Sequence, residues 1–132
     1  MAHERINPTD MYQPNKGIYT QVLKSSGGTT VHVAGIVSFD IDANVVGVGD
    51  MKAQTEKILD NIKISLAAAG ATPADVVRIN VYALDVDAYV QQGAPLVIAF
   101  FGDTKPTSTT VQVSRLVHPD WIVEIEATAV ID

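Results

Sequence analysis

The clearest element that the hydrophobic pattern predicts is an amphipathic helix over residues 50–70, "DMKAQTEKILDNIKISLAAAG". Apolar side chains recur three and four residues apart, so one side of the helix is apolar while the other carries most of the charge. Asp50 can cap the first turn, and Gly70 stands where a residue in the left-handed conformation commonly ends a helix. We therefore expect this helix to lie on another apolar element.

β-Rich runs flank this helix on both sides. Those at 19–24 and 29–37 are separated by "SSGG", which predicts a β-hairpin. Further strands are expected from about Val76 to Leu84, from Thr107 to Ser114 and from Ile122 to Ile131. The chain should therefore contain a sheet built from segments far apart in sequence.

A second helical region is predicted in "DVDAYVQQGAPLVIAFFG", beginning at Asp85 or Asp87. Proline in a helix interior loses a hydrogen bond and clashes with the preceding turn. We therefore expect a break near Gly93–Ala94, with Pro95 starting a second piece that ends at Phe101.

The predicted order is β-β-α-β-α-β-β in a single domain over residues 1–132, an α+β fold. Two helices can cover only one face of such a sheet. Alternation assigns to that face Val77, Ile79, Val81, Ala83, Val111, Val113, Val123, Ile125, Ala127 and Ala129. The opposite face then collects His32, Ala34, Ile36, Arg78, Asn80, Tyr82, Ser108, Thr110, Gln112, Ser114, Ile122, Glu124, Glu126, Thr128 and Val130.

This second set mixes small polar, apolar and acidic residues, and it contains no lysine. An exposed sheet face would usually carry several lysines. We therefore expect a homo-oligomer in which sheets of different subunits meet around a partly wet interior.

Composition narrows the possible partners. The 15 acidic residues outnumber the 9 basic ones, which gives a formal charge of -6, and Lys and Arg are scattered. A nucleic-acid-binding protein usually shows a basic stripe, so no nucleic-acid partner is expected. No apolar run approaches the length of a membrane span, and the polar start has no signal-peptide core, so we expect no membrane association and a cytoplasmic location.

Metal and thiol chemistry also find little support. The chain has no cysteine, and its histidines, His3, His32 and His118, lie far apart in sequence. We therefore expect no metal site.

Several stretches, in this order and spacing, resemble the YjgF/YER057c/UK114 (RidA) family of reactive-intermediate deaminases. "GIYTQ" at 17–21 resembles the family's Gly-Pro-Tyr-Ser-Gln, and "HVAGIV" at 32–37 its Ser-Gly-Gln strand end. "QTEKILDNIKISLAAAGATPADVVRINVYALDVDAY" is similar to its helix and following strand. "AFFGDTKPTSTTVQVSRL" and "VEIEATAV" resemble its Phe-Phe, Pro-Ala-Arg-Ser and Val-Glu-Ile-Glu-Ala segments.

The resemblance implies a chorismate-mutase-like subunit and a homotrimer with sheets inward, helices outward and a small-molecule cleft at each interface. Family members with the full motif hydrolyse imines and enamines to 2-oxo acids and ammonia without a cofactor. It also implies that Glu124, the first glutamate of Glu-Ile-Glu, lies near the attacking water as the catalytic carboxylate. Tyr19, Gly35, Ser108, Thr109 and Thr110 are the expected substrate-binding residues.

The sequence departs from the family where arginine would clamp a substrate carboxylate, because that position is Ser108. Ile18, Ile36 and Ala94 are further departures. Replacing a charge-assisted bidentate pair by one neutral bond would give up about 2–4 kcal/mol, or tens- to roughly a thousandfold in binding. Imines derived from amino acids are therefore expected to be poor substrates, unless Arg78 or Arg115 takes over.

Structural explanations compete with these roles. Glu124 can simply accept hydrogen bonds across an interface, and Glu126 can pair with Arg78 or with a neighbouring subunit. Tyr19 can pack at a cleft mouth, the hydroxyl residues 108–110 are ordinary strand formers, and a bulge would explain Gly35.

Three functions follow from the sequence. The first is hydrolysis of a small imine, enamine or related metabolite, and the second is binding of a metabolite without catalysis. The third is endoribonuclease activity, which the acidic composition disfavours.

Overall fold

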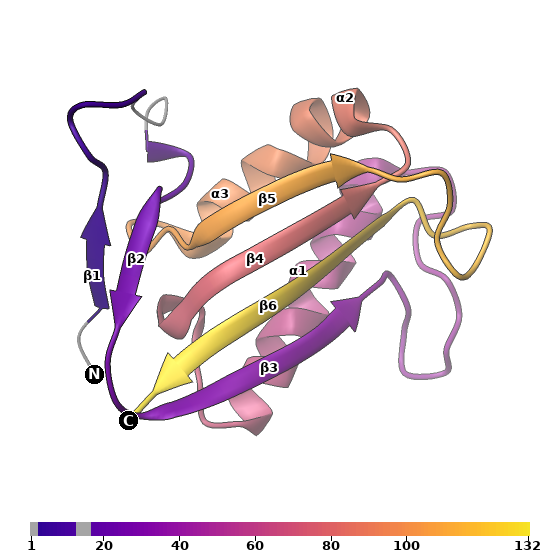
Figure 1. Cartoon of the computed structure of the whole chain (residues 1–132). Helices are drawn as coiled ribbons and strands as arrows, with labels where there is room; N and C mark the ends of the chain where they lie inside the picture. Colours follow the sequence, from indigo (N-terminus) through magenta and orange to yellow (C-terminus); the bar gives the residue numbers. More distant parts are fainter. Residues whose placement is uncertain (1–2, 13–16) are drawn as a thin grey trace.

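The computed structural model describes residues 3–12 and 17–132 of the chain. Four strands form one mixed sheet in the order β3-β6-β4-β5, namely β3 (Thr29–Ile36), β6 (Val123–Ile131), β4 (Val76–Ala83) and β5 (Thr107–Gln112). Strand β6 runs antiparallel to both neighbours, whereas β4 and β5 are parallel (Figure 1). The parallel pair needs a crossover, which the second helical region supplies.

Helix α1 (Met51–Ala68) forms as the pattern predicts. The Asp50 carboxylate accepts a hydrogen bond from the Ala53 amide at 3.0 Å, and Gly70 adopts φ +75° just beyond the last turn. Ile58, Ile62 and Leu66 are fully buried against the sheet. The predicted capping and packing of this helix are confirmed.

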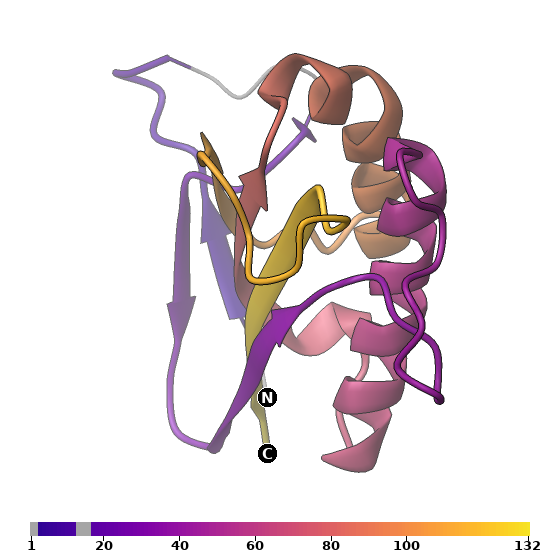
Figure 2. The same ribbon diagram turned by 90° about the vertical axis from the view of Figure 1, so that its right-hand side faces the viewer.

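Between α1 and β4 the chain makes a short 3₁₀ turn, Pro73–Asp75, whose Asp75 carboxylate accepts a hydrogen bond from the Thr72 amide at 2.8 Å. The core lies between the helices and one face of the sheet, where Val76, Val81, Ala83, Val123 and Ala129 are fully buried. Both helical regions lie on this face, and none of the described residues forms a helix over the opposite, open face of the sheet (Figure 2).

The second helical region is continuous rather than broken. It consists of α2 (Val86–Ala88), a π-helical turn (Tyr89–Gly93) and α3 (Ala94–Phe101). Asp85 caps its start, and the Ala94 amide donates to the Tyr89 carbonyl five residues back. The wider turn makes room for the Pro95 ring, which an α-helix would push against a carbonyl of the preceding turn.

The predicted hairpin between residues 19–24 and 29–37 does not form. Strand β2 (Val22–Ser25) pairs instead with β1 (His3–Ile6), a strand that the pattern did not predict, and β3 pairs with β6. The chain does turn at Gly27 and Gly28, both with positive φ, but the two strands then diverge. The β1–β2 ribbon projects on the open side of the sheet (Figure 2).

The face assignment of β5 was also wrong. Its parallel register sets Ser108 beside Ile79 and Thr110 beside Val81, so both hydroxyl residues lie on the helix side. Gln112 lies on that side too, beside Ala83, whereas Val111 lies beside Tyr82 on the open face. β5 is an edge strand whose helix side borders a cavity rather than filled core, so its alternation does not report burial.

Candidate functional site

Two carboxylates from β6 share the open face of the sheet. Glu126 accepts hydrogen bonds from the Tyr82 hydroxyl at 2.7 Å and from the Asn80 side-chain amide at 2.9 Å. The Tyr82 bond, followed by the Asn80 bond, lowers the pKa of the Glu126 carboxyl below its ordinary value of 4.5. Glu126 is therefore held in its ionised form.

Glu124 lies in a different environment two residues earlier. Burial raises the pKa of the Glu124 carboxyl above 4.5, and the negative charge of Glu126 adds to the effect. Two carboxylates whose pKa values are pushed apart are the usual arrangement of an acid–base site.

Gly35 leaves the space that the Glu124 side chain occupies. A Cβ atom at Gly35 would lie 2.9 Å from the Glu124 Cδ and 3.0 Å from its Oε1. Gly35 sits where the β3–β6 register shifts, between Val33 and Ile36. The structure therefore brings Gly35 and Glu124, two residues expected at the site, next to each other. Gly35 lies both at a β-bulge and in close contact with the Glu124 side chain.

Both candidate substitutes for the missing arginine lie near these carboxylates. Arg115 lines a shallow pocket of about 540 Å³ with Glu124, and its Nε donates to the Leu116 carbonyl at 3.3 Å. Arg78 lines a neighbouring pocket with Glu126 and His32. Its charge helps to lower the pKa of the Glu126 carboxyl, after the two hydrogen bonds.

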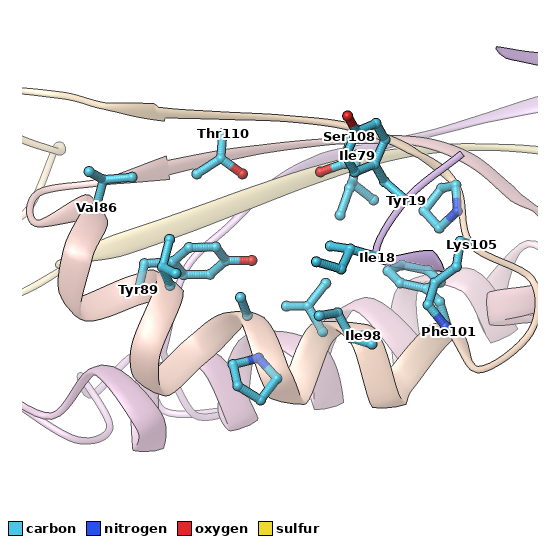
Figure 3. A pocket seen from close by; sticks show the side chains of 15 residues that line it. Ile18, Tyr19, Ile79, Val86, Tyr89, Ile98, Phe101, Lys105, Ser108 and Thr110 are labelled. Atoms are coloured by element: carbon cyan, nitrogen blue, oxygen red, sulfur yellow. The ribbon is translucent and has the colours of Figure 1, made fainter. Parts of the chain in front are cut away.

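A mostly apolar cavity of about 520 Å³ lies on the other face, between β5 and the second helical region (Figure 3). Tyr19, Ser108 and Thr110 line it, as do Tyr89 and Lys105. Tyr19 is carried there by the segment before β2, where the Thr20 amide donates to the Pro106 carbonyl at 3.1 Å and its hydroxyl to the Lys105 carbonyl at 2.6 Å. Within the described part of the chain, no carboxylate or guanidinium lines this cavity.

The six expected site residues thus divide into two groups within one protomer. Tyr19, Ser108 and Thr110 line the cavity, whereas Gly35 and Glu124 lie on the open face. Thr109 lies beside Asn80, on the open face as well. The expectation that Ser108 and Glu124 share a face is wrong.

The sequence of nearly the whole chain matches one family model. Residues 12–131 match the family described as Endoribonuclease L-PSP. The chain belongs to this family, the YjgF/RidA family.

Individual relatives agree with this membership. A RutC family protein of Pyrococcus abyssi is 36% identical over 113 residues, which cover 86% of this chain and 86% of the relative. The crystal structure of the Rid family protein YyfB of Yersinia pestis has a TM-score of 0.92 and 35% identity, covering 99% of this chain and all of that one. RidA from an Antarctic Psychrobacter has a TM-score of 0.72 and 30% identity, covering 94% and 97%. The chorismate-mutase-like α+β fold is therefore confirmed.

Within this RidA-family chain, Ser108 stands in a cavity wall to which no arginine of residues 3–12 and 17–132 contributes. No group of three or more His, Asp or Glu side chains suited to a metal ion is found in residues 3–12 and 17–132. In the same ranges, no helix is both long and apolar enough to cross a bilayer.

Sequence reasoning missed two parts of the site. Tyr82 and Asn80 were placed on the open face, but their bonds to Glu126 depend on strand pairing. Tyr89 was assigned only to a helix, although it forms part of the cavity wall. Gly93, the one glycine in that helical stretch, was the available signal, because such a glycine often marks a close approach of another group.

Proposed function

We propose that this protein hydrolyses a small imine, enamine or related reactive metabolite at a site built by two protomers of a homotrimer. The observation that carries the proposal is the raised pKa of Glu124, which lies against Gly35 and beside an ionised Glu126. A carboxylate with a raised pKa binds a proton more readily than an ordinary one, which suits it to proton transfer.

In the proposed reaction, Glu124 accepts a proton from water as the water oxygen bonds to the imine carbon. The carbon–nitrogen π electrons move to the nitrogen, which takes the proton from the Glu124 carboxyl to give a neutral carbinolamine. Glu124 then carries the carbinolamine hydroxyl proton to the nitrogen, so that ammonia leaves as the carbon–oxygen double bond forms. Glu124 is regenerated, so neither an oxidant nor a cofactor is consumed.

The division of residues supports a site between protomers. Glu124 and the Ser108 cavity lie on opposite faces of the same sheet, so one protomer cannot bring both to one small substrate. A neighbouring copy can place its open face against the cavity of the first. The family resemblance suggests three copies arranged in this way.

The first experiment compares imine hydrolysis by the wild type and by Glu124→Gln. An amine oxidase makes the imine in place from α-methylbenzylamine, and ammonia release is followed. We expect the wild type to speed ammonia release. The catalysed rate should fall on the order of a hundredfold in Glu124→Gln, within the usual range for general acid–base groups. Glu56→Gln, at an exposed position of α1, is the matched control. An unchanged rate in Glu124→Gln would remove this carboxylate from the mechanism.

A complementation experiment tests the division between protomers. Glu124→Gln and Ser108→Leu should each be inactive alone, since one lacks the carboxylate and the other fills the cavity. Mixed after unfolding and refolding, they should recover part of the activity, because some interfaces then join an intact Glu124 to an intact cavity. Failure of correctly assembled mixtures to recover any activity would contradict a shared site.

Binding without catalysis is the second candidate function. The cavity offers mainly apolar surface and neutral hydroxyls, which can hold a ligand without reacting with it. Tight binding of a ketone with no turnover of the related imine would favour this function. Endoribonuclease activity has less support, because the chain is acidic and its arginines are dispersed.

A further inference from the structure

The cavity between β5 and the second helical region has walls unlike those of a site for an ionised ligand. Ile79, Val97, Ile98 and Phe101 form much of its surface. Its volume of about 520 Å³ lies in the range of small-molecule sites. A ligand that enters it must leave water for apolar surroundings, which is costly for an unpaired charge.

Among the described residues that line this wall, Lys105 is the one cation. The Lys105 ammonium donates a hydrogen bond to the Gly102 carbonyl at the end of α3. The other polar side chains around the cavity are hydroxyls, among them those of Ser108 and Thr110. Apart from one ammonium directed at the end of α3, the cavity therefore offers only neutral hydroxyls and apolar side chains to a ligand.

Tyr89 is the most unusual of these hydroxyl residues. Its side chain is buried, with 4% of its surface exposed, and its hydroxyl points into the cavity (Figure 3). Within the described part of the chain this hydroxyl has no hydrogen-bond partner. Burial raises the pKa of the Tyr89 phenol well above its usual value, so the group remains a neutral donor. Because the hydroxyl faces the cavity, a ligand bound there can accept its hydrogen bond.

The π-helical turn fixes the position of this ring. A Cβ atom at Gly93 would lie 2.7 Å from the Tyr89 Cδ1 and 2.8 Å from the Thr55 Oγ1, so only glycine lets the ring pack there. The Tyr89 carbonyl accepts the Ala94 amide that closes the turn. π-Helical turns are frequent at functional sites.

We propose that the cavity selects an uncharged, largely apolar imine or ketone, whose polar atom accepts a hydrogen bond from the Tyr89 hydroxyl. This proposal rests on the proposed function and deepens it, because it names the substrate class and a specificity-determining residue. An aromatic or branched aliphatic body would fill the apolar part of the cavity, and the Tyr89 hydroxyl would gain the partner that it lacks.

The test compares two stable ketones that differ only where one carries a methyl group and the other a carboxylate, acetophenone and phenylglyoxylate. Each is titrated into the full chain, and amide NMR signals and affinity are measured. Acetophenone should shift the signals of Gly93, Ser108 and Thr110, and phenylglyoxylate should bind about tenfold or more weakly. Equal or tighter cavity binding of phenylglyoxylate would overturn the proposed selectivity.

Tyr89→Phe tests the hydroxyl itself. This variant should weaken acetophenone binding about three- to tenfold, the usual effect of one neutral hydrogen bond. Tyr12→Phe, at an exposed tyrosine, should bind like the wild type. Ile98→Trp, which fills the cavity, provides a second test and should abolish binding. Wild-type affinity in a folded Tyr89→Phe, or in a folded Ile98→Trp, would overturn the proposal.

Binding and turnover separate this inference from the proposed function. If acetophenone binds in the cavity and depends on Tyr89 while no imine is turned over, the selectivity stands and the hydrolase function fails. If imines are hydrolysed with Glu124 dependence while acetophenone leaves the cavity signals unchanged, the hydrolase function stands and this inference is overturned.

Discussion

At the scale of single residues, the contrast between two neighbouring glutamates is the main chemical feature of this protein. Glu126 is satisfied by Tyr82 and Asn80, whereas burial disfavours the charge of Glu124. The same residue type therefore plays two parts, one structural and one poised for proton transfer.

This contrast predicts opposite pH effects on stability. Glu124 has a raised pKa in the folded state, so wild-type stability falls as pH rises from the ordinary value of 4.5 through that raised pKa. Glu124→Gln should therefore stabilise the protein at neutral pH, and the gain should vanish below pH 4.5. Thermal melting across this range measures the effect.

Glu126→Gln should behave in the opposite way. Its pKa is lowered in the folded state, so the carboxylate contributes stability above 4.5 that is lost as pH falls through the lowered pKa. Glu126→Gln should destabilise the protein at neutral pH, with a smaller loss in acid. Parallel pH profiles for the two variants would contradict the assignment of their environments.

We expect the Gly35→Ala variant to lose activity while it keeps its fold. The added methyl group would displace the Glu124 carboxylate, because their separation would be only 2.9 Å. The glutamate is flexible enough to move, so the melting temperature should change little. A displacement of about 1 Å can cost on the order of a hundredfold in rate. Ala34→Ser, at the exposed neighbouring position, is the control, and equal activity in both variants would count against the contact.

At the scale of elements, one buried side chain joins helix α1 to two loops. Gln54 donates from Nε2 to the Gly47 carbonyl at 3.2 Å and to the Asp120 carbonyl at 2.8 Å. Its Oε1 accepts from the Ile122 amide at 3.1 Å. The loop before α1 and the loop before β6 are thereby held together.

Gln54→Met should consequently cost about 2–4 kcal/mol of unfolding free energy, because a side chain of similar size leaves these backbone groups without partners. Urea unfolding measures the loss. Gln91→Met, at an exposed position of the π-helical turn, should change stability by less than about 0.5 kcal/mol. Similar midpoints for both variants would show that water replaces Gln54 at no cost.

The same scale shows what a sequence pattern can and cannot predict. Helix α1 was predicted in full because its amphipathic period and both ends are local signals. Strand β5 was placed correctly but assigned the wrong face, since Val111 suggested burial while register with β4 decides the direction. The hairpin prediction failed because strand partners depend on the whole sheet. Glu124 and Gly35 lie together, which the sequence pattern did not predict, and the separation of Ser108 from them is a property of the topology.

At the scale of the whole molecule, the open face predicts association. Val111 is 42% exposed there beside Tyr82, so an aspartate at this position would introduce a charge where we expect another copy to pack. Val111→Asp should lower the mass measured by light scattering toward that of one chain. Ile64→Asp, on α1 and 67% exposed, should keep the wild-type mass. A Val111→Asp protein with the wild-type mass would place the interface elsewhere.

The π-helical turn has a consequence for insertions and deletions. It holds one residue more than an α-helix would use, and a residue advances an α-helix by about 100°. Deleting Gln92 would let the Tyr89 carbonyl and the Ala94 amide pair as in an α-helix, but the narrower turn would push the Pro95 ring against a carbonyl and shift the Tyr89 phenol relative to the cavity. The length of this segment would then decide which ligands the cavity accepts. A relative with one residue fewer here would be expected to bind different molecules, even with the same residues in the cavity wall.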